Sequence, residues 1–234
     1  MKKYNVAVIG VGAVGIEMLR VLRQRNFPIG ELRVFARSAR DIEVDGQTYS
    51  VKPISPDGFA GIDIALFAGT EGEKGAAVTF AQEAVKRGAV VIDNGADFRM
   101  DPKVPLVVPE VNAKDVKKHK GIIANPNCST IQMVVALWPI YKKAGIKRII
   151  VTTLQASSGA GRGAVEQLRK ELIELSESEY QSIRKKFCRN SLLIMFFRIS
   201  EVLRNAIILM KNGNWCMKPI RLCTMIKSKF PQLR

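Results

Sequence analysis

The sequence of 234 residues predicts an α/β protein with a doubly wound parallel sheet, followed by the start of a second, α+β domain. Short apolar runs alternate with amphipathic helical patterns, the order of elements that a parallel sheet requires. The first apolar run leads into a glycine-rich loop at residues 10–15 and from there into a helix. A different pattern begins after Lys147, where an apolar run precedes a loop of small residues and another helix.

The apolar runs and helical spacings define the expected elements. We expect strands of the sheet at residues 4–9, 32–36, 62–67, 89–92, 106–108 and 121–124. Helices are expected after Gly15 (through Met18, Leu19, Val21 and Leu22), at residues 76–87, and from Cys128 through Tyr141. In the second part we expect a strand at 148–154 and a helix at 163–175.

The basic charge is concentrated in the last quarter of the chain. The sequence has 37 Lys and Arg against 21 Asp and Glu, a formal net charge of +16. Residues 181–234 hold 12 of the basic residues and a single acid, Glu201, whereas residues 1–180 hold the remaining 25 and 20. Nucleic-acid binding would call for a recognisable module or an aromatic stacking platform, and the sequence has neither. We therefore expect no nucleic-acid partner.

Cysteine usage and the first residues indicate a cytoplasmic protein. The four cysteines lack the spacing of a small disulfide scaffold, as expected in a reducing compartment. The start of the chain runs directly into a glycine-bounded strand and does not resemble a signal peptide. No apolar run approaches the length of a membrane span. We expect no membrane partner, and we assign no residue to a metal.

The loop Gly10-Val11-Gly12-Ala13-Val14-Gly15 predicts a dinucleotide-binding turn. It follows a strand and opens a helix, the context in which backbone N–H groups approach a pyrophosphate. The second strand ends in Ala36-Arg37-Ser38, where an NAD enzyme usually carries an acid for the ribose hydroxyls. Arg37 and Ser38 suit a 2′-phosphate instead, which favours NADP. A glycine turn without a ligand and a solvated basic turn are the structural alternatives.

The most informative motif is Asn125-Pro126-Asn127-Cys128-Ser129-Thr130-Ile131-Gln132. It places Cys128 where an apolar run ends and a helical pattern begins, so that the thiol feels the positive end of a helix dipole. This environment favours the thiolate and indicates covalent catalysis. The alternative is a buried cysteine that acts as a small apolar residue. The only histidine is His119, which we expect in a solvated loop, so the usual partner of such a thiol is missing.

These motifs resemble the aspartate-semialdehyde dehydrogenase family from residue 4 to about residue 175. The resemblance is carried by the glycine loop, Ala36-Arg37-Ser38, Asp93-Asn94, Phe98-Arg99-Met100-Asp101-Pro102, residues 107–112, the octapeptide, Gln155 and Ser158-Gly159-Ala160-Gly161. It implies a Rossmann-type domain. It also implies an NADP-dependent, reversible reductive dephosphorylation of aspartyl phosphate to aspartate semialdehyde, in lysine, threonine and methionine biosynthesis.

The resemblance implies a role for individual residues. Cys128 would form a thioester with the substrate, and Gln155 would orient it. Arg99 would bind the phosphate, a role that its fork of donors suits, and Asn127 would lie beside the nucleophile. The residues expected to contact NADP are Gly10, Gly12, Ala13, Val14, Gly15, Arg37, Ser38, Asn94, Ser158 and Gly159. The alternatives are a surface ion pair for Arg99 and a polar strand end for Gln155.

Beyond about residue 180 the resemblance stops. We interpret residues 181–234 as the product of a one-base frameshift in the gene near Lys186. When the third base of each codon is read with the first two of the next, synonymous codons allow residues 206–233 to resemble the family's following segment. That segment includes a Glu-Glu-x-Lys substrate and phosphate site. Several residues of the shifted reading are fixed rather than chosen, because Met and Trp have only one codon each. A basic composition with three cysteines (Cys188, Cys216 and Cys223) fits such text.

We therefore predict an NADP-binding domain at 1–127, the start of a catalytic and dimerisation domain at 128–180, and an out-of-family basic tail at 181–234. The chain would keep its nucleophile but lack the family's general base, which typically contributes ~10²–10⁴-fold. Its activity would be impaired, and a non-catalytic NADP-binding remnant is the alternative function. The resemblance also implies a homodimer or tetramer built through the second domain, an assembly that the loss of most of that domain would weaken.

Overall fold

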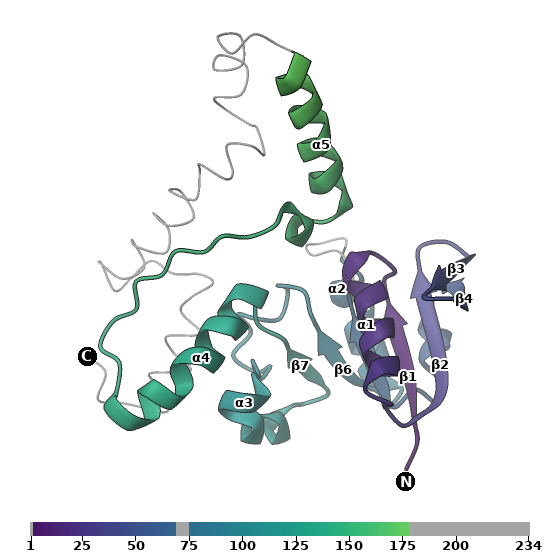
Figure 1. Cartoon of the computed structure of the whole chain (residues 1–234). Helices are drawn as coiled ribbons and strands as arrows, with labels where there is room; N and C mark the ends of the chain where they lie inside the picture. Colours follow the sequence, from purple (N-terminus) through teal and green to yellow (C-terminus); the bar gives the residue numbers. More distant parts are fainter. Residues whose placement is uncertain (1, 69–74, 178–234) are drawn as a thin grey trace. The chain divides into compact units, whose positions relative to one another are not determined.

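The computed structural model describes residues 2–68 and 75–177 (Figure 1). The chain divides into two compact units, Met1–Gly145 and a second unit that begins at Ile146. The predictions for residues 181–234 lie outside the described residues. Within the described ranges, no helix is both long and apolar enough to cross a membrane.

The first unit is built on a seven-stranded sheet in the order β3-β4-β2-β1-β5-β6-β7. Its strands are β1 Tyr4–Ile9, β2 Ile29–Ala36, β3 Arg40–Val44, β4 Gln47–Pro53, β5 Ile64–Phe67, β6 Val90–Asp93 and β7 Ile122–Ala124. All neighbouring strands pair in parallel except β3, which runs antiparallel to β4 at the edge. The strand order reverses direction between β1 and β5, so the predicted doubly wound sheet is confirmed.

Both faces of the sheet carry an apolar core. The helices of this unit are α1 Ala13–Gln24, α2 Ala76–Lys86, α3 Pro109–Asn112 and α4 Cys128–Ala144, with 3-10 turns η1 Pro56–Phe59 and η2 Ala113–Lys118. Successive strand residues point to opposite faces. Val8 and Val34 therefore pack with Leu19 of α1, whereas Ala7 packs in a separate cluster with Ala81 of α2. This division fixes α1 and α2 to the two faces.

The antiparallel hairpin of β3 and β4 is absent from the sequence prediction. Its turn is Asp45-Gly46, and both residues have positive φ angles, 51° and 77°. This is the geometry of the type I′ turn, whose twist matches that of the strands it joins. Arg20 of α1 bonds the Asp45 carboxylate at 3.0 Å, which ties the hairpin to the helix. The Asp-Gly dipeptide between alternating apolar residues was the signal for this element.

The strand predicted at 106–108 is wrong. Only Leu106 forms a bridge, with Ala124 of β7. The N–H of Val108 donates instead to the Asn112 side chain at 2.7 Å, and Pro109 then opens α3. Val107 N–H donates to Ala124 O of β7, and the next residue that would donate to β7 is Pro109, which has no N–H, so the pairing ends after one bridge.

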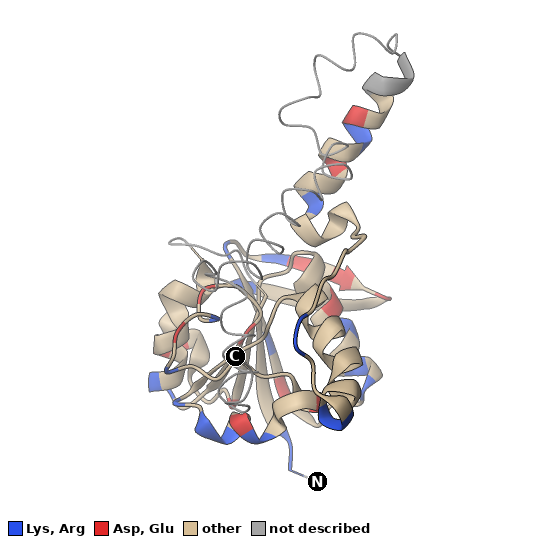
Figure 2. Ribbon diagram, turned by 90° about the vertical axis from the view of Figure 1, so that its left-hand side faces the viewer, with Lys and Arg blue, Asp and Glu red and all other residues tan. Residues whose placement is uncertain are grey.

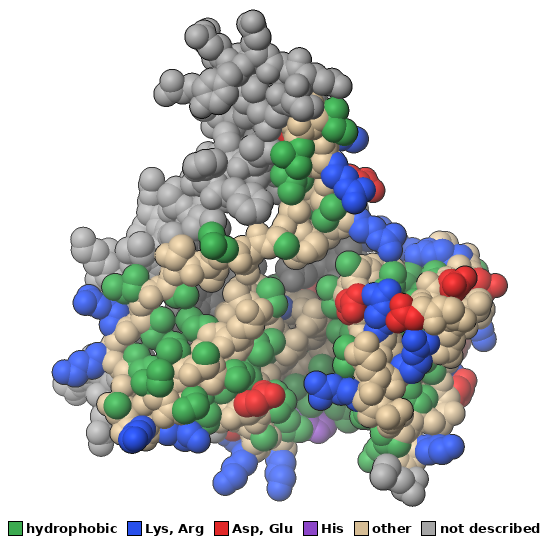
Figure 3. Space-filling model, viewed as in Figure 1, with side chains coloured by type: hydrophobic (Ala, Val, Ile, Leu, Met, Phe, Trp, Pro, Cys, Tyr) green, Lys and Arg blue, Asp and Glu red, His purple; other side chains and the backbone are tan. Residues whose placement is uncertain are grey.

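The second unit is described from Ile146 to residue 177. It contains a 3-10 turn, η3 Ser157–Ala160, and a helix, α5 Arg162–Glu177, so the helix predicted at 163–175 is confirmed. The strand predicted at 148–154 is wrong, since no strand within the described ranges pairs with this run. Its side chains are largely uncovered, with Ile150 72% and Leu154 84% exposed. Hydrophobic side chains are also visible along α5, where Leu172 and Ile173 are more than half exposed (Figure 3).

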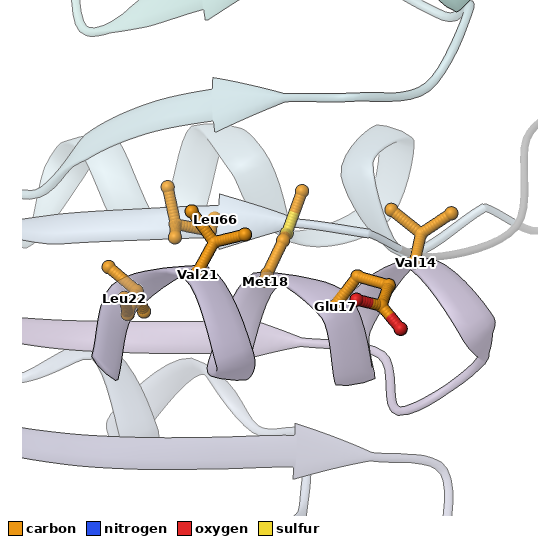
Figure 4. Close-up of a pocket in the computed structure, with 6 residues that line it drawn as sticks. All are labelled: Val14, Glu17, Met18, Val21, Leu22 and Leu66. Atoms are coloured by element: carbon orange, nitrogen blue, oxygen red, sulfur yellow. The ribbon is translucent and has the colours of Figure 1, made fainter. Parts of the chain in front are cut away.

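A shallow apolar groove follows α1 in the first unit (Figure 4). It is lined by Val14, Glu17, Met18, Val21, Leu22 and Leu66. Val14 and Val21 are 46% and 42% exposed, so this side of α1 is only partly covered. Along the described ribbon in Figure 2, the positions of Lys and Arg are interspersed with those of Asp and Glu, in keeping with the concentration of net charge in residues 181–234.

Candidate active site at the carboxyl edge of the sheet

The carboxyl ends of the parallel strands bring the predicted residues of the first unit to one edge. Backbone hydrogen bonds extend one residue past the strands: Gly10 N–H donates to Phe35 O at 2.8 Å, Asn94 N–H to Phe67 O at 3.0 Å, and Asn125 N–H to Asp93 O at 2.8 Å. The glycine loop, Asn94 and the octapeptide all follow this edge. In open α/β sheets, ligands bind outside the carboxyl ends, where the strand order reverses.

Glycine occupies each of the three positions of the loop for a different structural reason. Gly10 has a φ of 99°, a conformation that glycine adopts without strain. A Cβ at Gly15 would lie 1.8 Å from Gly10 O, so only glycine allows α1 to pack this closely on the loop. A Cβ at Gly12 would meet nothing within 4 Å. Gly12 therefore leaves open space at the helix N-terminus, and this space fits a pyrophosphate on the N–H groups of Ala13, Val14 and their neighbours.

The end of β2 is basic and exposed. Arg37 and Ser38 directly follow this strand, and both side chains are exposed. Arg40, to which the sequence interpretation gave no role, donates from Nη1 to Ser38 Oγ at 3.2 Å. β2 lies beside β1, so this segment borders the same edge as the glycine loop. The segment that follows β2 thus carries two guanidinium groups and a hydroxyl.

Cys128 is the first residue of α4, and it is free and exposed. This placement excludes the alternative of a buried, inert cysteine. Asn127 is the N-cap of α4, and its Oδ1 accepts from Ser129 N at 3.1 Å and from Ser129 Oγ at 2.6 Å. The Cys128 thiol is 3.9 Å from the same oxygen. Asn127 thus lies beside the thiol, as the sequence predicts, and it also fixes the start of the helix.

Arg99 holds the ends of two strands together. Its Nε donates to the backbone oxygen of Asn125 at 2.8 Å, and its Nη2 donates to the backbone oxygen of Asn94 at 2.8 Å. These residues follow β7 and β6. The two contacts place Arg99 next to the segment that carries Cys128. In both of them Arg99 donates to a backbone oxygen of the protein itself. Phosphate binding by Arg99 stays a prediction.

Asn125 is the residue whose part in this site the sequence interpretation missed. Its Nδ2 donates to Asn94 Oδ1 at 2.6 Å, which links the segments that follow β7 and β6. Asn94 and Asn125 are far apart in sequence, and only the pairing of β6 with β7 brings them together. The signal available was the position of Asn125 at the opening of the octapeptide.

Asp93, at the end of β6, is buried with 1% exposure. Its Oδ1 accepts from Gly95 N at 3.0 Å. Burial raises the pKa of this carboxyl above its ordinary value of 3.8, and the nearby charge of Asp97 acts in the same direction. The N–H of Gly95 and the charge of Arg99 oppose this shift. A carboxyl that disfavours ionisation thus lies directly before Asn94.

Replacing Asp93 with asparagine should change how stability depends on pH. With a raised native pKa, the native state holds the Asp93 proton more tightly than the unfolded chain. The stability that this difference contributes is fully present at pH values below the pKa of Asp93 in the unfolded chain. It is lost as the pH rises through the pKa of Asp93 in the native state. Asp93→Asn keeps an oxygen for Gly95 N–H but cannot ionise. The free energy of unfolding of the variant relative to the native chain should therefore increase as the pH rises through the native pKa of Asp93.

Urea unfolding, followed by circular dichroism at a series of pH values from acidic to neutral, measures the difference in unfolding free energy between the variant and the native chain. The matched control is Asp41→Asn, which neutralises an exposed aspartate on β3. Equal pH dependence in the two variants would contradict the role of burial at Asp93.

The remaining predicted residues belong to the second unit or precede β7. Gln155, Ser158 and Gly159 belong to the second unit, and all three are exposed. His119 is half-buried rather than fully solvated, and its Nδ1 accepts from Gly121 N at 3.0 Å. His119 precedes β7 and Cys128 follows it, so the two residues lie at opposite ends of this strand.

Comparisons with known proteins identify the class to which this fold and site belong. The family model described as "Semialdehyde dehydrogenase, NAD binding domain" matches residues 5–119, and "Semialdehyde dehydrogenase, dimerisation domain" matches residues 137–210. The chain is 52% identical over 192 residues to aspartate-semialdehyde dehydrogenase of Aquifex aeolicus, covering 79% of this chain and 55% of the relative. It is 52% identical over 170 residues to the Bacillus subtilis enzyme, covering 70% and 48%.

A solved structure agrees with these relatives. The crystal structure of Vibrio cholerae aspartate semialdehyde dehydrogenase II complexed with ASA has a TM-score of 0.69 and 43% identity, covering 76% of this chain and 54% of that one. The chain belongs to the aspartate-semialdehyde dehydrogenase family. It spans about half the length of the relatives it matches.

Proposed function

We propose that this chain carries the cysteine nucleophile and the nucleotide-binding part of an enzyme that reduces aspartyl phosphate to aspartate semialdehyde, in the pathway that leads to lysine, threonine and methionine. The observation that carries the proposal is the exposed thiol of Cys128 at the start of α4, on the edge of the sheet where the glycine loop lies. The family and the ASA-bound relative support this choice of substrate.

The chemistry follows from the thiolate. Cys128 Sγ attacks the acyl carbon, the carbon–oxygen bond to phosphate breaks, and phosphate leaves with the bonding pair, which gives a thioester on Cys128. A bound nicotinamide dinucleotide supplies the hydride that reduces this thioester. Cleavage of the carbon–sulfur bond then releases the aldehyde and regenerates the thiolate. Gln155 would orient the acyl group, and Arg99 would bind the phosphate.

We propose that the catalytic turnover of the 234-residue chain is slow. Proton transfer at the thioester stage would use a general base, and the only histidine of the sequence lies at the other end of β7 from Cys128. We propose that the chain binds NADP and forms the acyl-enzyme but turns over slowly. A non-catalytic NADP-binding remnant is the second candidate. It is favoured by the same observation, that the single histidine lies at the other end of β7 from Cys128.

The test is an assay of the purified chain with NADP⁺, phosphate and aspartate semialdehyde. NADPH absorbance should rise by at most one equivalent per chain in a first phase and then only slowly. Rapid turnover after the first equivalent would contradict impairment, and NADP binding without any acylation of Cys128 would favour the remnant. A chain that neither binds NADP nor reacts at Cys128 would refute both.

Arg37 should decide between the two nicotinamide dinucleotides. Arg37→Ala removes a charged donor from the 2′-phosphate position and should weaken NADP binding by about 10-fold or more, with little effect on NAD. Titration calorimetry with both cofactors measures the ratio. The control is Arg25→Ala, which removes an exposed arginine at the far end of α1. Equal losses for NADP and NAD would remove Arg37 from the 2′-phosphate site.

A cytoplasmic location and the state of assembly belong to the same proposal. The second family model is named for dimerisation, and α4 and α5 carry uncovered apolar residues that include Ile140 (55% exposed). A homodimer or tetramer is therefore the assembly proposed for a full-length member.

A further inference from the structure

We propose that Asn125 is a positioning residue, which holds the segment leading to Cys128 against the end of β6 through its bond to Asn94. The inference deepens the proposed function, because it concerns how the nucleophile is placed. It rests on hydrogen bonds of Asn125, on the fixed geometry of the next two residues, and on the short distance from Asn125 to the thiol along the chain.

Asn125 is bonded to its neighbours at three points. Its N–H donates to Asp93 O at 2.8 Å, its backbone oxygen accepts from Arg99 Nε at 2.8 Å, and its side chain donates to Asn94 Oδ1 at 2.6 Å. All three partners lie in residues 93–99, directly after or at the end of β6. Both the backbone and the side chain of Asn125 are thus fixed to this one segment.

The partner segment is itself fixed. Asn94 N–H donates to Phe67 O of β5 at 3.0 Å, and Asn94 O accepts from Arg99 Nη2 at 2.8 Å. Arg99 therefore contacts the backbone on both sides of the Asn94–Asn125 side-chain bond. We name Asn94, Arg99 and Asn125 the strand-end clasp. It connects β5, β6 and β7 at the edge where the cofactor would bind.

Little freedom remains between the clasp and the thiol. Pro126 is buried, and its ring fixes φ. Asn127 is held in an extended conformation (φ −62°, ψ 144°) by its bonds to Ser129. Cys128 follows immediately. A displacement of Asn125 would therefore move the thiol relative to the strand ends, and a misplacement of ~1 Å costs about 10²-fold in an oriented reaction.

The experiment measures the order and reactivity of the octapeptide without any substrate or cofactor. Asn125→Ala and Asn94→Ala each remove the side-chain bond, and the matched control, Asn5→Ala, removes an asparagine that bridges Gly61 O (2.9 Å) and Glu31 N (3.1 Å) away from this edge. Hydrogen exchange is followed over residues 125–131. Iodoacetamide labelling of Cys128 is read on the tryptic peptide 121–142, in which it is the only cysteine.

Both clasp variants should accelerate exchange over 125–131 and change the rate of Cys128 labelling by about twofold or more, because Sγ loses its fixed place at the start of α4. Access cannot limit the labelling, since Cys128 is already exposed. The double variant should show no larger effect than either single one, as expected when both remove one interaction. Asn5→Ala should leave both measurements unchanged.

Additive effects in the double variant, or an octapeptide that behaves alike in Asn125→Ala and Asn5→Ala, would overturn the proposal. The outcome is independent of the proposed function, which fails separately if Cys128 does not accept an acyl group. If Asn125→Ala does not fold, Asn94→Ala tests the same bond from its other side.

Discussion

Cys128→Ser is expected to abolish transfer of an acyl group to this chain. Acetyl phosphate is a simple acyl phosphate with the same leaving group as the proposed substrate, and it should acylate the Cys128 thiol. A serine hydroxyl at the same position is hardly ionised, so the rate should fall on the order of 10³-fold or more. Mass spectrometry of the tryptic peptide 121–142 measures the adduct, and its release by hydroxylamine identifies a thioester.

The other cysteines of the chain supply the control for this prediction. A variant with Cys188, Cys216 and Cys223 replaced by serine keeps Cys128 as the only thiol. This variant should acylate at the native rate. Loss of the adduct in the triple variant, with retention in Cys128→Ser, would show that the nucleophile lies in residues 181–234 instead.

The parallel sheet and the start of α4 could be predicted from the sequence because their signals are local. The apolar run of β1 leads directly into the glycine loop, and Cys128 follows the run of β7 after three residues. In both places a strand ends and a helix begins within a few residues. The two predicted strands that are wrong also have apolar runs, but strands need partners. Residues 106–108 form a single bridge because the next donor toward β7 would be Pro109, which has no N–H.

The strand-end clasp could not be predicted, because its bonds join residues distant in sequence. Nothing local in Asp93-Asn94 indicates that its partner is Asn125, and the donors of Arg99 could equally have suited an external phosphate. Only the adjacency of β6 and β7 brings the three residues together. The burial of Asp93 is also a consequence of its place on β6, which lies between β5 and β7.

Gly15→Ala and Gly12→Ala should separate the structural from the binding role of the glycine loop. At Gly15 the added methyl would lie 1.8 Å from Gly10 O and 2.8 Å from Gly10 C, so the backbone itself has to move. Overpacking of this kind typically costs ~1–3 kcal/mol or more. We therefore expect Gly15→Ala to lower the thermal midpoint of unfolding and also to lose NADP binding.

At Gly12 the added methyl meets no atom of the described residues within 4 Å, and φ is −74°, so alanine fits the backbone. Thermal unfolding of Gly12→Ala should stay close to that of the native chain. Calorimetric titration with NADP should nevertheless show a loss of about 10-fold or more, because the methyl would occupy the space in which the pyrophosphate approaches the helix N-terminus. Unchanged NADP affinity in Gly12→Ala would mean that this loop is a tight turn without a ligand. A large loss of stability in Gly12→Ala, equal to that in Gly15→Ala, would mean that both glycines serve packing alone.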